Sequence, residues 1–599
     1  MRSVDLCFCV RFLSCAFRWG QVESLLAMSC RCLRFCRRVD ARLCIYVLSI
    51  LLPFALSPLA VSAHKESKCS YVMILVASYW LLEPVPIAVT ALLPVVLFPI
   101  LGVVNSTQVC SNYMKEPFLM FIGGFIVAIA VEECKLHERI ALKVLLLIGT
   151  EIKWLMLGFM LTTMFLSMWI SNMATILMMV PIVEAVIEEI DIKSNHLAFS
   201  DNKGTISLPE RKQMDDDPGE DNFLSKTSLK QERKMSTGAS TIKVTLLLSL
   251  CYAANLGGTG TLSGTAANIV LKGLMEELYP DSDDITFASW MMYNIPGMVV
   301  CVLVGWMYLW LVYIRFSKLN FAPEGKIKDI ISKRYSDLGS LTSHEAQVLV
   351  LFLALVFLWV FRDPKFIPGW AYAMRPDTKI GDSVPAIAIA FLMFILPSNI
   401  GEWNSPRILE WKTAQAKIPW GVLILVGGGF ALADAAQKSG LSKFLGEELM
   451  FLAVLPPGAM VVVVCLVTAM ITEIITNTIT ATILLPIFSQ MAVSIGVNPL
   501  YMMLPITVAC AYAFMLPVAT PPNAIVFESG NMKTLDMAKP GLAMNLACCA
   551  VQLFMINTLG VAMFNLREFP NWANSSRISI ESATSSVHNS TFFNVSAMY

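Results

Sequence analysis

The fold is decided by the stretch Ser167-Met-Trp-Ile-Ser-Asn-Met-Ala-Thr-Ile-Leu-Met-Met-Val-Pro-Ile182 and by a second stretch that repeats it, Thr472-Glu-Ile-Ile-Thr-Asn-Thr-Ile-Thr-Ala-Thr-Ile-Leu-Leu-Pro-Ile487. The hydroxyl residues, the asparagine and the proline recur at one offset of 305 positions. The same offset relates Gly123-Gly124-Phe125 to Gly428-Gly429-Phe430. One offset that holds without a gap from residue 123 to residue 182 is not expected by chance, so the chain contains two homologous halves.

The repeat continues after a single gap. Gly264-Thr265-x-x-Asn268 in the first half corresponds to Ala519-Thr520-x-x-Asn523 in the second, and the gap has about the length of the polar segment 191–242. In the topology expected below, the first Gly-Gly-Phe span runs inward and the second runs outward, so the repeats are inverted. Inverted repeats with broken helices are typical of secondary transporters whose site lies at the bilayer midplane.

Composition indicates a membrane protein. Of the 599 residues, 56% are hydrophobic and only 15% are charged, against about 25% charged residues in an average soluble domain. We therefore expect an all-α polytopic protein embedded in a lipid bilayer. The 44 basic and 44 acidic residues cancel, so no basic surface for nucleic acid is expected. The apolar segments contain no His-Glu metal motif and no nucleophile–base pair, which argues against an enzyme.

Apolar segments of spanning length predict about 11 transmembrane helices. They are 44–63, 70–84, 85–104, 118–133, 243–277 (interrupted), 288–314, 346–361, 383–398, 418–435, 500–529 (interrupted) and 541–564. Two further apolar regions, 140–190 and 446–490, each carry a polar Ser/Thr-Asn cluster at the middle. A lipid-facing helix would not tolerate such a cluster, so we interpret both regions as re-entrant helical hairpins.

Flanking charges set the expected orientation. Five arginines lie between residues 31 and 42, directly before the first span, and six Lys or Arg residues lie in the loop 315–345, so both regions are expected to be cytoplasmic. Glycosylation sequons at Asn574, Asn589 and Asn594 indicate an extracellular C-terminus, and we expect the plasma membrane. The segment 362–382 fits less well, because it carries four basic residues on the expected outer side.

These signals divide the chain into seven segments. They are a cytoplasmic N-terminal extension (1–43), first-half spans with the inner hairpin (44–190), a disordered cytoplasmic loop (191–242), a broken helix with a span and a cytoplasmic loop (243–345), second-half spans (346–445), the outer hairpin with a broken helix and the last span (446–564), and a glycosylated extracellular tail (565–599).

Four polar turns are expected to converge: the hairpin tips at 171–173 and 476–478, and the helix breaks near 264–268 and 519–523. Broken helices expose free N–H groups, which favour anions, and free C=O groups, which together with Ser, Thr and Asn oxygens favour Na⁺. No Lys or Arg occurs in these turns, so helix dipoles and co-bound Na⁺ must balance a bound anion. A filled cation site then raises the affinity for the anion, and the anion raises the affinity for Na⁺ equally.

Several polar residues also have a structural interpretation. Ser167 and Thr472, taken singly, could equally bond to their own backbone, whereas their repetition favours cation ligands. Gly123 and Gly428 are interpreted as close-packing positions. Glu473 is interpreted as a structural hydrogen-bonding partner rather than a proton carrier.

We also state expectations for three side chains outside the turns. Asp434 lies near the end of a predicted span and is expected to be solvated. Cys69 and Cys110 are expected to face the same side of the membrane and to pair.

Four motifs carry a family resemblance. They are Ser171-Asn-Met-Ala-Thr-Ile-Leu-Met-Met-Val-Pro181, Gly257-Gly-Thr-Gly-Thr-Leu-Ser-Gly-Thr265, Val426-Gly-Gly-Gly-Phe-Ala-Leu-Ala-Asp434 and Phe514-Met-Leu-Pro-Val-Ala-Thr-Pro-Pro-Asn-Ala-Ile-Val-Phe527. With these motifs the chain, over roughly residues 40–570, resembles the divalent anion:sodium symporters, the animal sodium-coupled di/tricarboxylate and sulfate cotransporters. The resemblance implies a homodimer with scaffold and transport domains and an elevator-type movement.

The resemblance also implies which residues bind the ligands. One sodium site would use Ser167, Ser171, Asn172 and the backbone from Gly264 to Ala266, and the other would use Thr472, Asn477 and the Ala519 carbonyl. The substrate carboxylates would lie against Asn172, Met173, Thr476, Asn477, Thr478 and Thr520. Sodium would be co-transported and would not act as a prosthetic cofactor.

The sequence departs from the family pattern at three positions. Met173 stands where a threonine hydroxyl is expected, Thr476 replaces serine, and Ala267 replaces proline. Losing one hydroxyl contact costs about 0.5–1.5 kcal/mol, which is enough to retune a site.

The favoured function is a sodium-driven symporter of succinate- or citrate-like di/tricarboxylates that works by alternating access. The stretches Met178-Met-Val-Pro-Ile-Val-Glu-Ala185 and Gly496-Val-Asn-Pro-Leu-Tyr501 resemble the carboxylate branch of the family. A sodium:sulfate symporter and an anion channel are the alternatives.

Overall fold

The computed structural model is built of helices. It describes residues 41–148, 151–203, 241–315, 325–364, 367–375, 378–402, 404–441, 444 and 455–573. Within these ranges no strand forms, and the one isolated bridge pairs Pro397 with Arg407. The predicted all-α fold is confirmed for this part of the chain. Residues 1–40 of the predicted N-terminal extension and the three sequon asparagines lie outside the described residues.

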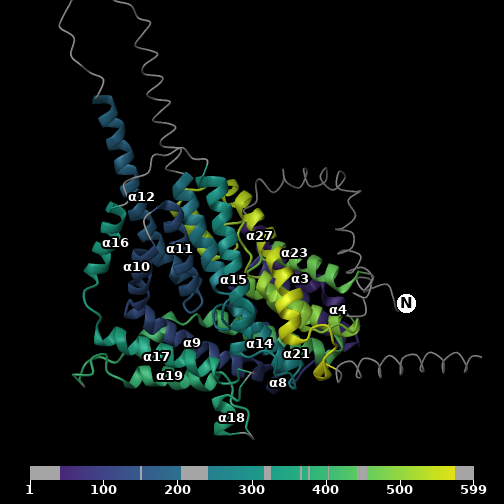
Figure 1. Cartoon of the computed structure of the whole chain (residues 1–599). Helices are drawn as coiled ribbons and strands as arrows, with labels where there is room; N and C mark the ends of the chain where they lie inside the picture. The colour runs from purple at the N-terminus through teal and green to yellow at the C-terminus, as the bar shows by residue number, and fades with distance from the viewer. Residues whose placement is uncertain are drawn as a thin grey trace, which may run out of the picture.

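Figure 1 shows the helices in chain order. The first half contains α3 (Ala41–Ala55), α4 (Ser57–Val61), α5 (Lys65–Leu82), α6 (Ile87–Thr90), α7 (Leu93–Ile100), α8 (Ser106–Ser111), η1 (Asn112–Met114), α9 (Glu116–Glu133), α10 (Leu136–Ile148), α11 (Ile152–Ser167), α12 (Asn172–Lys203), the helix Thr241–Gly257, α14 (Ala266–Leu278), α15 (Phe287–Leu309) and η2 (Trp310–Ile314). The second half contains α16 (Gly325–Asp337), α17 (Ser343–Val360), α18 (Trp370–Met374), α19 (Ser383–Ile395), α20 (Trp411–Lys417), α21 (Trp420–Ser439), α23 (Pro457–Ile471), α24 (Asn477–Ser494), α25 (Leu500–Ala509), α26 (Pro521–Ser529), α27 (Thr534–Met555), η4 (Ile556–Gly560), α28 (Val561–Phe564) and η5 (Asn571–Ala573).

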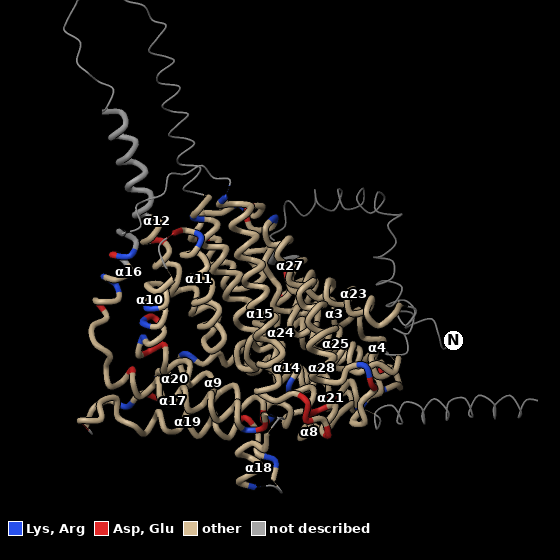
Figure 2. Tube along the Cα trace, in the orientation of Figure 1, with Lys and Arg blue, Asp and Glu red and all other residues tan. Residues whose placement is uncertain are grey.

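Several helices have the length and the apolar character of membrane spans. Among the described residues there are five of them: Ser106–Glu133, Phe287–Ile314, Ser343–Val360, Trp420–Ser439 and Thr534–Phe564. Each coincides with a predicted span, and most of the other predicted spans appear as shorter apolar helices. Figure 2 shows that the central helices α15, α24 and α25 carry no Lys, Arg, Asp or Glu, whereas charges gather toward the periphery. This distribution fits a multi-pass membrane protein.

Both predicted hairpins and both predicted helix breaks are present as local structure. α11 and α12 are joined by the turn 168–171, and α23 and α24 by the turn 472–476. The first broken helix is interrupted at 258–265 and the second at 510–520. The internal sequence repeat therefore located these four interruptions of helical structure.

Each broken helix packs against the hairpin of the other half. α14 lies beside α24, and α26 lies beside α12; Figure 2 labels α14 and α24 as neighbours. Tyr279 Oη lies 2.7 Å from Ser489 Oγ. Tyr279 is 13 positions beyond Ala266, where α14 begins, and Ser489 is 12 positions beyond Asn477, where α24 begins. This contact joins the residue that follows α14 to the last third of α24.

The remaining helices support this central arrangement. α9, α17 and α19 lie together along the lower edge of Figure 1, and α21 packs against α5, α6 and α7. Glycines allow the close approach of two of these pairs. A Cβ atom on Gly123 would lie 2.7 Å from Ala386 Cβ, and one on Gly428 would lie 2.6 Å from Ala91 O. The close-packing interpretation of both glycines is confirmed.

Basic residues of the segment 362–382 have partners within the protein. Arg362 forms an ion pair with buried Asp382 at 2.6 Å and donates to Ile380 O. Lys379 lies 3.5 Å from Asp283. Two of the four basic residues thus serve in ion pairs, which explains why the segment departs from the charge pattern of an outer loop.

Two expectations about side chains were wrong. Asp434 is only 2% exposed, because it accepts a hydrogen bond from Asn112 and forms an ion pair with Lys438. Cys69 is buried and Cys110 is exposed, and both are free thiols.

One predicted boundary also shifts. The helix α12 continues to Lys203, into the segment 191–242 that was expected to be disordered. Residues 204–240 of that segment lie outside the described part of the chain.

We expect Gly428→Ala to destabilise the protein. The new Cβ would lie 2.6 Å from Ala91 O and 2.9 Å from Ala91 Cβ, and overpacking of this kind typically costs about 1–3 kcal/mol. Thermal unfolding of the purified protein should therefore occur at a lower temperature. Gly421→Ala on the same helix is the control, because its Cβ would lie 3.5 Å from Ala88 Cβ, an ordinary contact. Equal unfolding temperatures for both variants would contradict the packing argument.

Candidate functional site

The first hairpin turn is tied to the first broken helix by a triad of oxygen atoms. Ser167 Oγ, at the end of α11, lies 2.7 Å from Asn172 Oδ1, at the start of α12. The same hydroxyl lies 2.8 Å from the carbonyl oxygen of Ala254, near the end of the helix Thr241–Gly257. Ser167 is fully buried, so these contacts are shielded from water.

The second half repeats the triad. Thr472 Oγ1 lies 2.9 Å from Asn477 Oδ1 and 2.7 Å from the carbonyl oxygen of Cys510, just beyond the end of α25. Thr472 is also fully buried. The offset of 305 that relates the two sequences thus relates the same hydroxyl–amide contact in space.

The atoms of each triad suit a cation. Each triad combines a hydroxyl, an asparagine side-chain amide and a backbone carbonyl oxygen, none of which is charged. Oxygens of these three kinds coordinate Na⁺ at helix breaks in transporters.

Glycine brings the backbone of the first break onto the hairpin turn. A Cβ on Gly257 would overlap Met164 O, and a Cβ on Gly258 would lie 3.0 Å from Asn172 Oδ1 and 3.3 Å from Gly264 O. The Asn172 amide therefore lies close to the Gly258 backbone, at the start of the break, and the carbonyl of Gly264 lies close to the same glycine.

An asparagine closes each broken loop. Asn268 Nδ2 donates to the carbonyl oxygens of Gly258 at 3.0 Å and Thr261 at 2.7 Å. Asn523 Nδ2 donates in the same way to the carbonyl oxygens of Ala513 and Leu516, both at 2.8 Å. Backbone carbonyls that lack helical partners are thereby satisfied in a buried site.

Glu473 holds the second loop from the hairpin side. Its carboxylate accepts hydrogen bonds from the backbone N–H groups of residues 514, 515 and 516 at 2.8–3.1 Å, and from Asn545 Nδ2 at 2.7 Å. The side chain is 3% exposed. The structural interpretation of Glu473 is therefore confirmed. The equivalent residue in the first half, Met168, contributes only its carbonyl, which accepts from Thr261 Oγ1 at 2.6 Å.

Four helices begin at these turns, which suits an anion. They are α12, α14, α24 and α26. In α26 the first two residues are prolines, which have no N–H, so its first free donor is the N–H of Asn523. The first-turn N–H groups of a helix carry a partial positive charge. Because no Lys or Arg lies in the four turns, these N–H groups and bound cations are the available positive charges.

The other predicted ligands differ in their exposure and in their hydrogen-bond partners. Ser171 Oγ accepts from Ala174 N and so caps α12 instead of joining the triad. Met173 is 48% exposed at the start of the same helix. Thr520 Oγ1 is buried and donates to Asn523 Oδ1 at 2.9 Å, so it is directed into the loop. Thr476 and Thr478 are half-buried beside Asn477, and the Thr476 hydroxyl has no hydrogen-bond partner among the described residues.

Ala266 and Ala519 are both buried, at the start of α14 and in the second break. The oxygens that complete the triads, the carbonyls of Ala254 and Cys510, were missed by the sequence reasoning. A backbone carbonyl leaves no side-chain pattern, so only the exact end of each helix could have indicated it.

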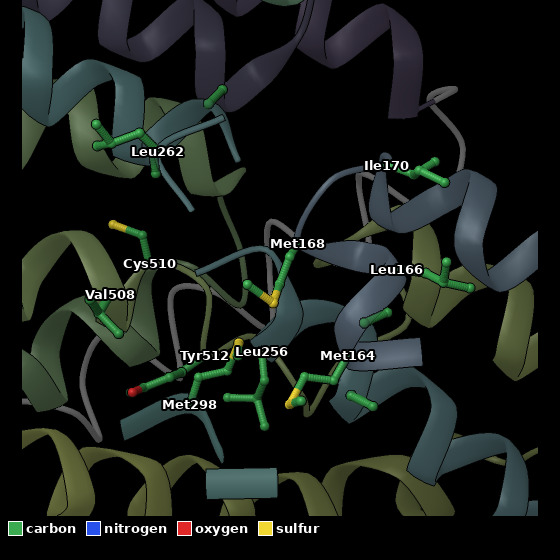
Figure 3. Packing of buried hydrophobic residues seen from close by; sticks show 14 of the residues in the cluster. Met164, Leu166, Met168, Ile170, Leu256, Leu262, Met298, Val508, Cys510 and Tyr512 are labelled. Atoms are coloured by element: carbon green, nitrogen blue, oxygen red, sulfur yellow. The ribbon is translucent and has the colours of Figure 1, made fainter. Parts of the chain in front are cut away.

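Apolar side chains surround the turns. Figure 3 shows side chains from the first hairpin, the first broken helix, α15 and the second broken helix. The labelled residues are Met164, Leu166, Met168, Ile170, Leu256, Leu262, Met298, Val508, Cys510 and Tyr512. All of them are less than 9% exposed. Exclusion of water strengthens the electrostatic interactions inside such a shell.

Comparison with known proteins adds an independent line of information. Residues 40–566 match the family model described as the sodium:sulfate symporter transmembrane region. The mouse Na(+)/citrate cotransporter is 40% identical over 561 residues, which cover 89% of this chain and 97% of the relative. The human protein named solute carrier family 13 member 2 is 40% identical over 561 residues, covering 88% and 95%. The rat Na(+)/dicarboxylate cotransporter 3 is 37% identical over 577 residues, covering 90% and 96%.

We expect Thr472→Val to weaken Na⁺ binding by roughly tenfold, because it removes the hydroxyl of the second triad while keeping its shape. Thr472→Ser is the matched control, since it keeps the hydroxyl that Ser167 supplies in the first half. The measurement is the Na⁺ concentration that gives half of the Na⁺-dependent rise in unfolding temperature of the purified protein, with choline as the reference ion. If the valine variant responds to Na⁺ like the parent chain, the triad is not a cation site.

Proposed function

We propose that this chain, which belongs to the sodium:sulfate symporter family, is a sodium-coupled symporter of di- and tricarboxylates. The observation that carries the proposal is the pair of oxygen triads at Ser167 and Thr472, which repeat one cation-binding chemistry at the two hairpin turns. The family and the relatives are transporters; the chain is accordingly not an enzyme.

Charge balance supplies the coupling. The proposed sodium ligands are neutral, so each bound Na⁺ keeps its full charge and attracts an anion at the adjoining helix N-termini. We assign sodium to Ser167, Ser171, Asn172 and the Gly264–Ala266 backbone in one site, and to Thr472, Asn477 and the Ala519 carbonyl in the other. The substrate carboxylates are assigned to Asn172, Met173, Thr476, Asn477, Thr478 and Thr520. By linkage, anion and Na⁺ raise each other's affinity.

Carboxylate is favoured over sulfate as the substrate. The names of the matched relatives specify citrate and dicarboxylate, at 36–41% identity over nearly their whole length. The family description mentions sulfate, which keeps a sodium:sulfate symporter as the second candidate. A channel is less consistent with the architecture, because channels usually form one continuous pore from symmetric subunits.

The transport movement and the assembly are further parts of the proposal. Two inverted halves around shared turns support alternating access by an elevator-type movement, with about 11 spans and two re-entrant hairpins. We also propose a homodimer in the plasma membrane, with a cytoplasmic N-terminus and an extracellular tail glycosylated at Asn574, Asn589 and Asn594. A mobility shift on deglycosylation tests the tail, and chemical cross-linking in membranes tests the dimer.

Uptake of labelled substrates tests the function. Cells that express the chain should accumulate citrate or succinate in Na⁺ buffer and should lose this uptake when choline replaces Na⁺. Unlabelled sulfate should compete weakly, because the site is proposed to hold carboxylates at two places. Equal uptake in the two buffers would refute symport, and strong mutual competition between sulfate and succinate would favour the second candidate.

We expect Met173→Thr to change the KM for the carboxylate substrate by about two- to tenfold, because the variant supplies a hydroxyl at the N-terminus of α12. Met292→Thr on α15 is a control at a similarly exposed methionine, 49% exposed against 48% for Met173, and should leave KM unchanged. Initial rates at saturating Na⁺ provide the measurement. Unchanged KM in the Met173 variant would mean that position 173 faces away from the substrate.

A further inference from the structure

One buried side chain of the first half reaches the broken loop of the second half. Asn255 lies in the last turn of the helix Thr241–Gly257 and is 1% exposed. Its Nδ2 lies 3.1 Å from Asn523 Oδ1, 3.4 Å from Thr520 Oγ1 and 3.5 Å from Ala513 O. Asn255 therefore contacts both ends of the second break.

The acceptor of this contact is the residue that closes the second loop. Asn523 Oδ1 is approached by three donors: Cys251 Sγ at 2.7 Å, Thr520 Oγ1 at 2.9 Å and Asn255 Nδ2 at 3.1 Å. Two of them, Cys251 and Asn255, belong to the first half. The orientation of the Asn523 amide is thereby fixed, and its Nδ2 is directed at the loop carbonyls.

The equivalent asparagine in the first half is held less firmly. Asn268 uses its Nδ2 in the same way, but its Oδ1 is buried and receives no hydrogen bond among the described residues. The second loop also has the Glu473 carboxylate on three of its N–H groups, where the first half has Met168. The two breaks are related by sequence but differ in how completely side chains fix them.

We propose that Asn255 is a positioning residue that pre-organises the second cation site from the first half of the chain. It acts through Asn523 and Thr520 on the loop that carries the Cys510 and Ala519 carbonyls, so the Thr472 triad is assembled before Na⁺ arrives. The loop beside the first site is held by fewer side-chain contacts, because Asn268 Oδ1 receives no hydrogen bond among the described residues. The inference rests on the proposed sodium-coupled transport. It adds an order of binding, in which the second site fills at a lower Na⁺ concentration than the first.

The hydrogen-bonding role of Asn255 can be tested by a variant that keeps the shape of the side chain but removes its donor. Asn255→Asp keeps the shape but replaces the donor amide with an oxygen that would face Asn523 Oδ1, Thr520 Oγ1 and Ala513 O. Asn255→Ala removes the contact, and Asn255→Ser keeps a small polar group that cannot span the distance. Asn294→Ala is the matched control, because Asn294 is 4% exposed and donates only within its own helix, to Trp290 O.

The first readout is the Na⁺ dependence of the purified full-length protein and of uptake. We expect all three Asn255 variants to raise the Na⁺ concentration for half-maximal stabilisation by about five- to tenfold, with Asp the largest effect. The substrate KM at saturating Na⁺ and the maximal rate per surface copy should change less than about twofold. A loss of maximal rate with unchanged Na⁺ dependence would indicate a merely structural role and would overturn the proposal. If the alanine variant fails to reach the membrane, the serine variant carries the same comparison.

Additivity provides the second readout. Asn255→Ala should add nothing to the Na⁺ defect of Thr472→Val, because both act on one site, whereas its effect should add to that of Ser167→Ala. The reverse pattern would assign Asn255 to the first site and refute the inference. If the parent chain shows no Na⁺-dependent uptake, the proposed function fails; if it does and the Asn255 variants match it, only this inference fails.

Discussion

The structure depends on the need to satisfy backbone groups wherever a helix is interrupted inside an apolar protein. Two hairpin turns and two breaks would otherwise leave carbonyl and N–H groups without partners, at a cost of several kcal/mol each in a water-free setting. Here the hydroxyls of Ser167 and Thr472 and the amides of Asn268 and Asn523 meet that need. The residues that make the interruptions tolerable also bring hydroxyl, amide and carbonyl oxygens together at the turns. Substitutions at these positions are therefore expected to affect stability as well as the proposed binding.

The two halves show how an ancestral repeat becomes specialised. The hydroxyl–amide contact is common to both, and so is the asparagine that closes each loop. The carboxylate of Glu473 is present in the second half alone, where it binds the N–H groups of the loop. A carboxylate beside one turn and a methionine at the equivalent place beside the other make the two turns electrostatically different. The two turns are thus similar in sequence, but they differ in the electrostatic field at the turn and in how firmly side chains hold the neighbouring loop.

Sequence reasoning located the elements of this architecture but not their atomic partners. The internal repeat identified both hairpin turns, at an offset of 305, and both breaks, at an offset of 255 after the gap. It could do so because polar residues in apolar segments leave a pattern that survives duplication. The prediction for Asp434 was wrong, since nothing near it in the sequence reveals Asn112, which approaches from a distant segment. The Cys69–Cys110 pairing was wrong for a similar reason: sharing one side of the membrane does not bring two side chains together. The carbonyls of Ala254 and Cys510 were not predicted, because the residue at which a helix ends is set by tertiary packing.

The exchange of partners between the halves has a consequence for biosynthesis. α14 rests on α24 and α12 rests on α26, so the first half leaves the ribosome with the surfaces for both contacts uncovered. Neither half can bury those faces with its own helices. The fold can therefore be completed only when the last quarter of the polypeptide has been synthesised. A chain truncated before α24 would expose the apolar surfaces of α12 and α14, which favours aggregation.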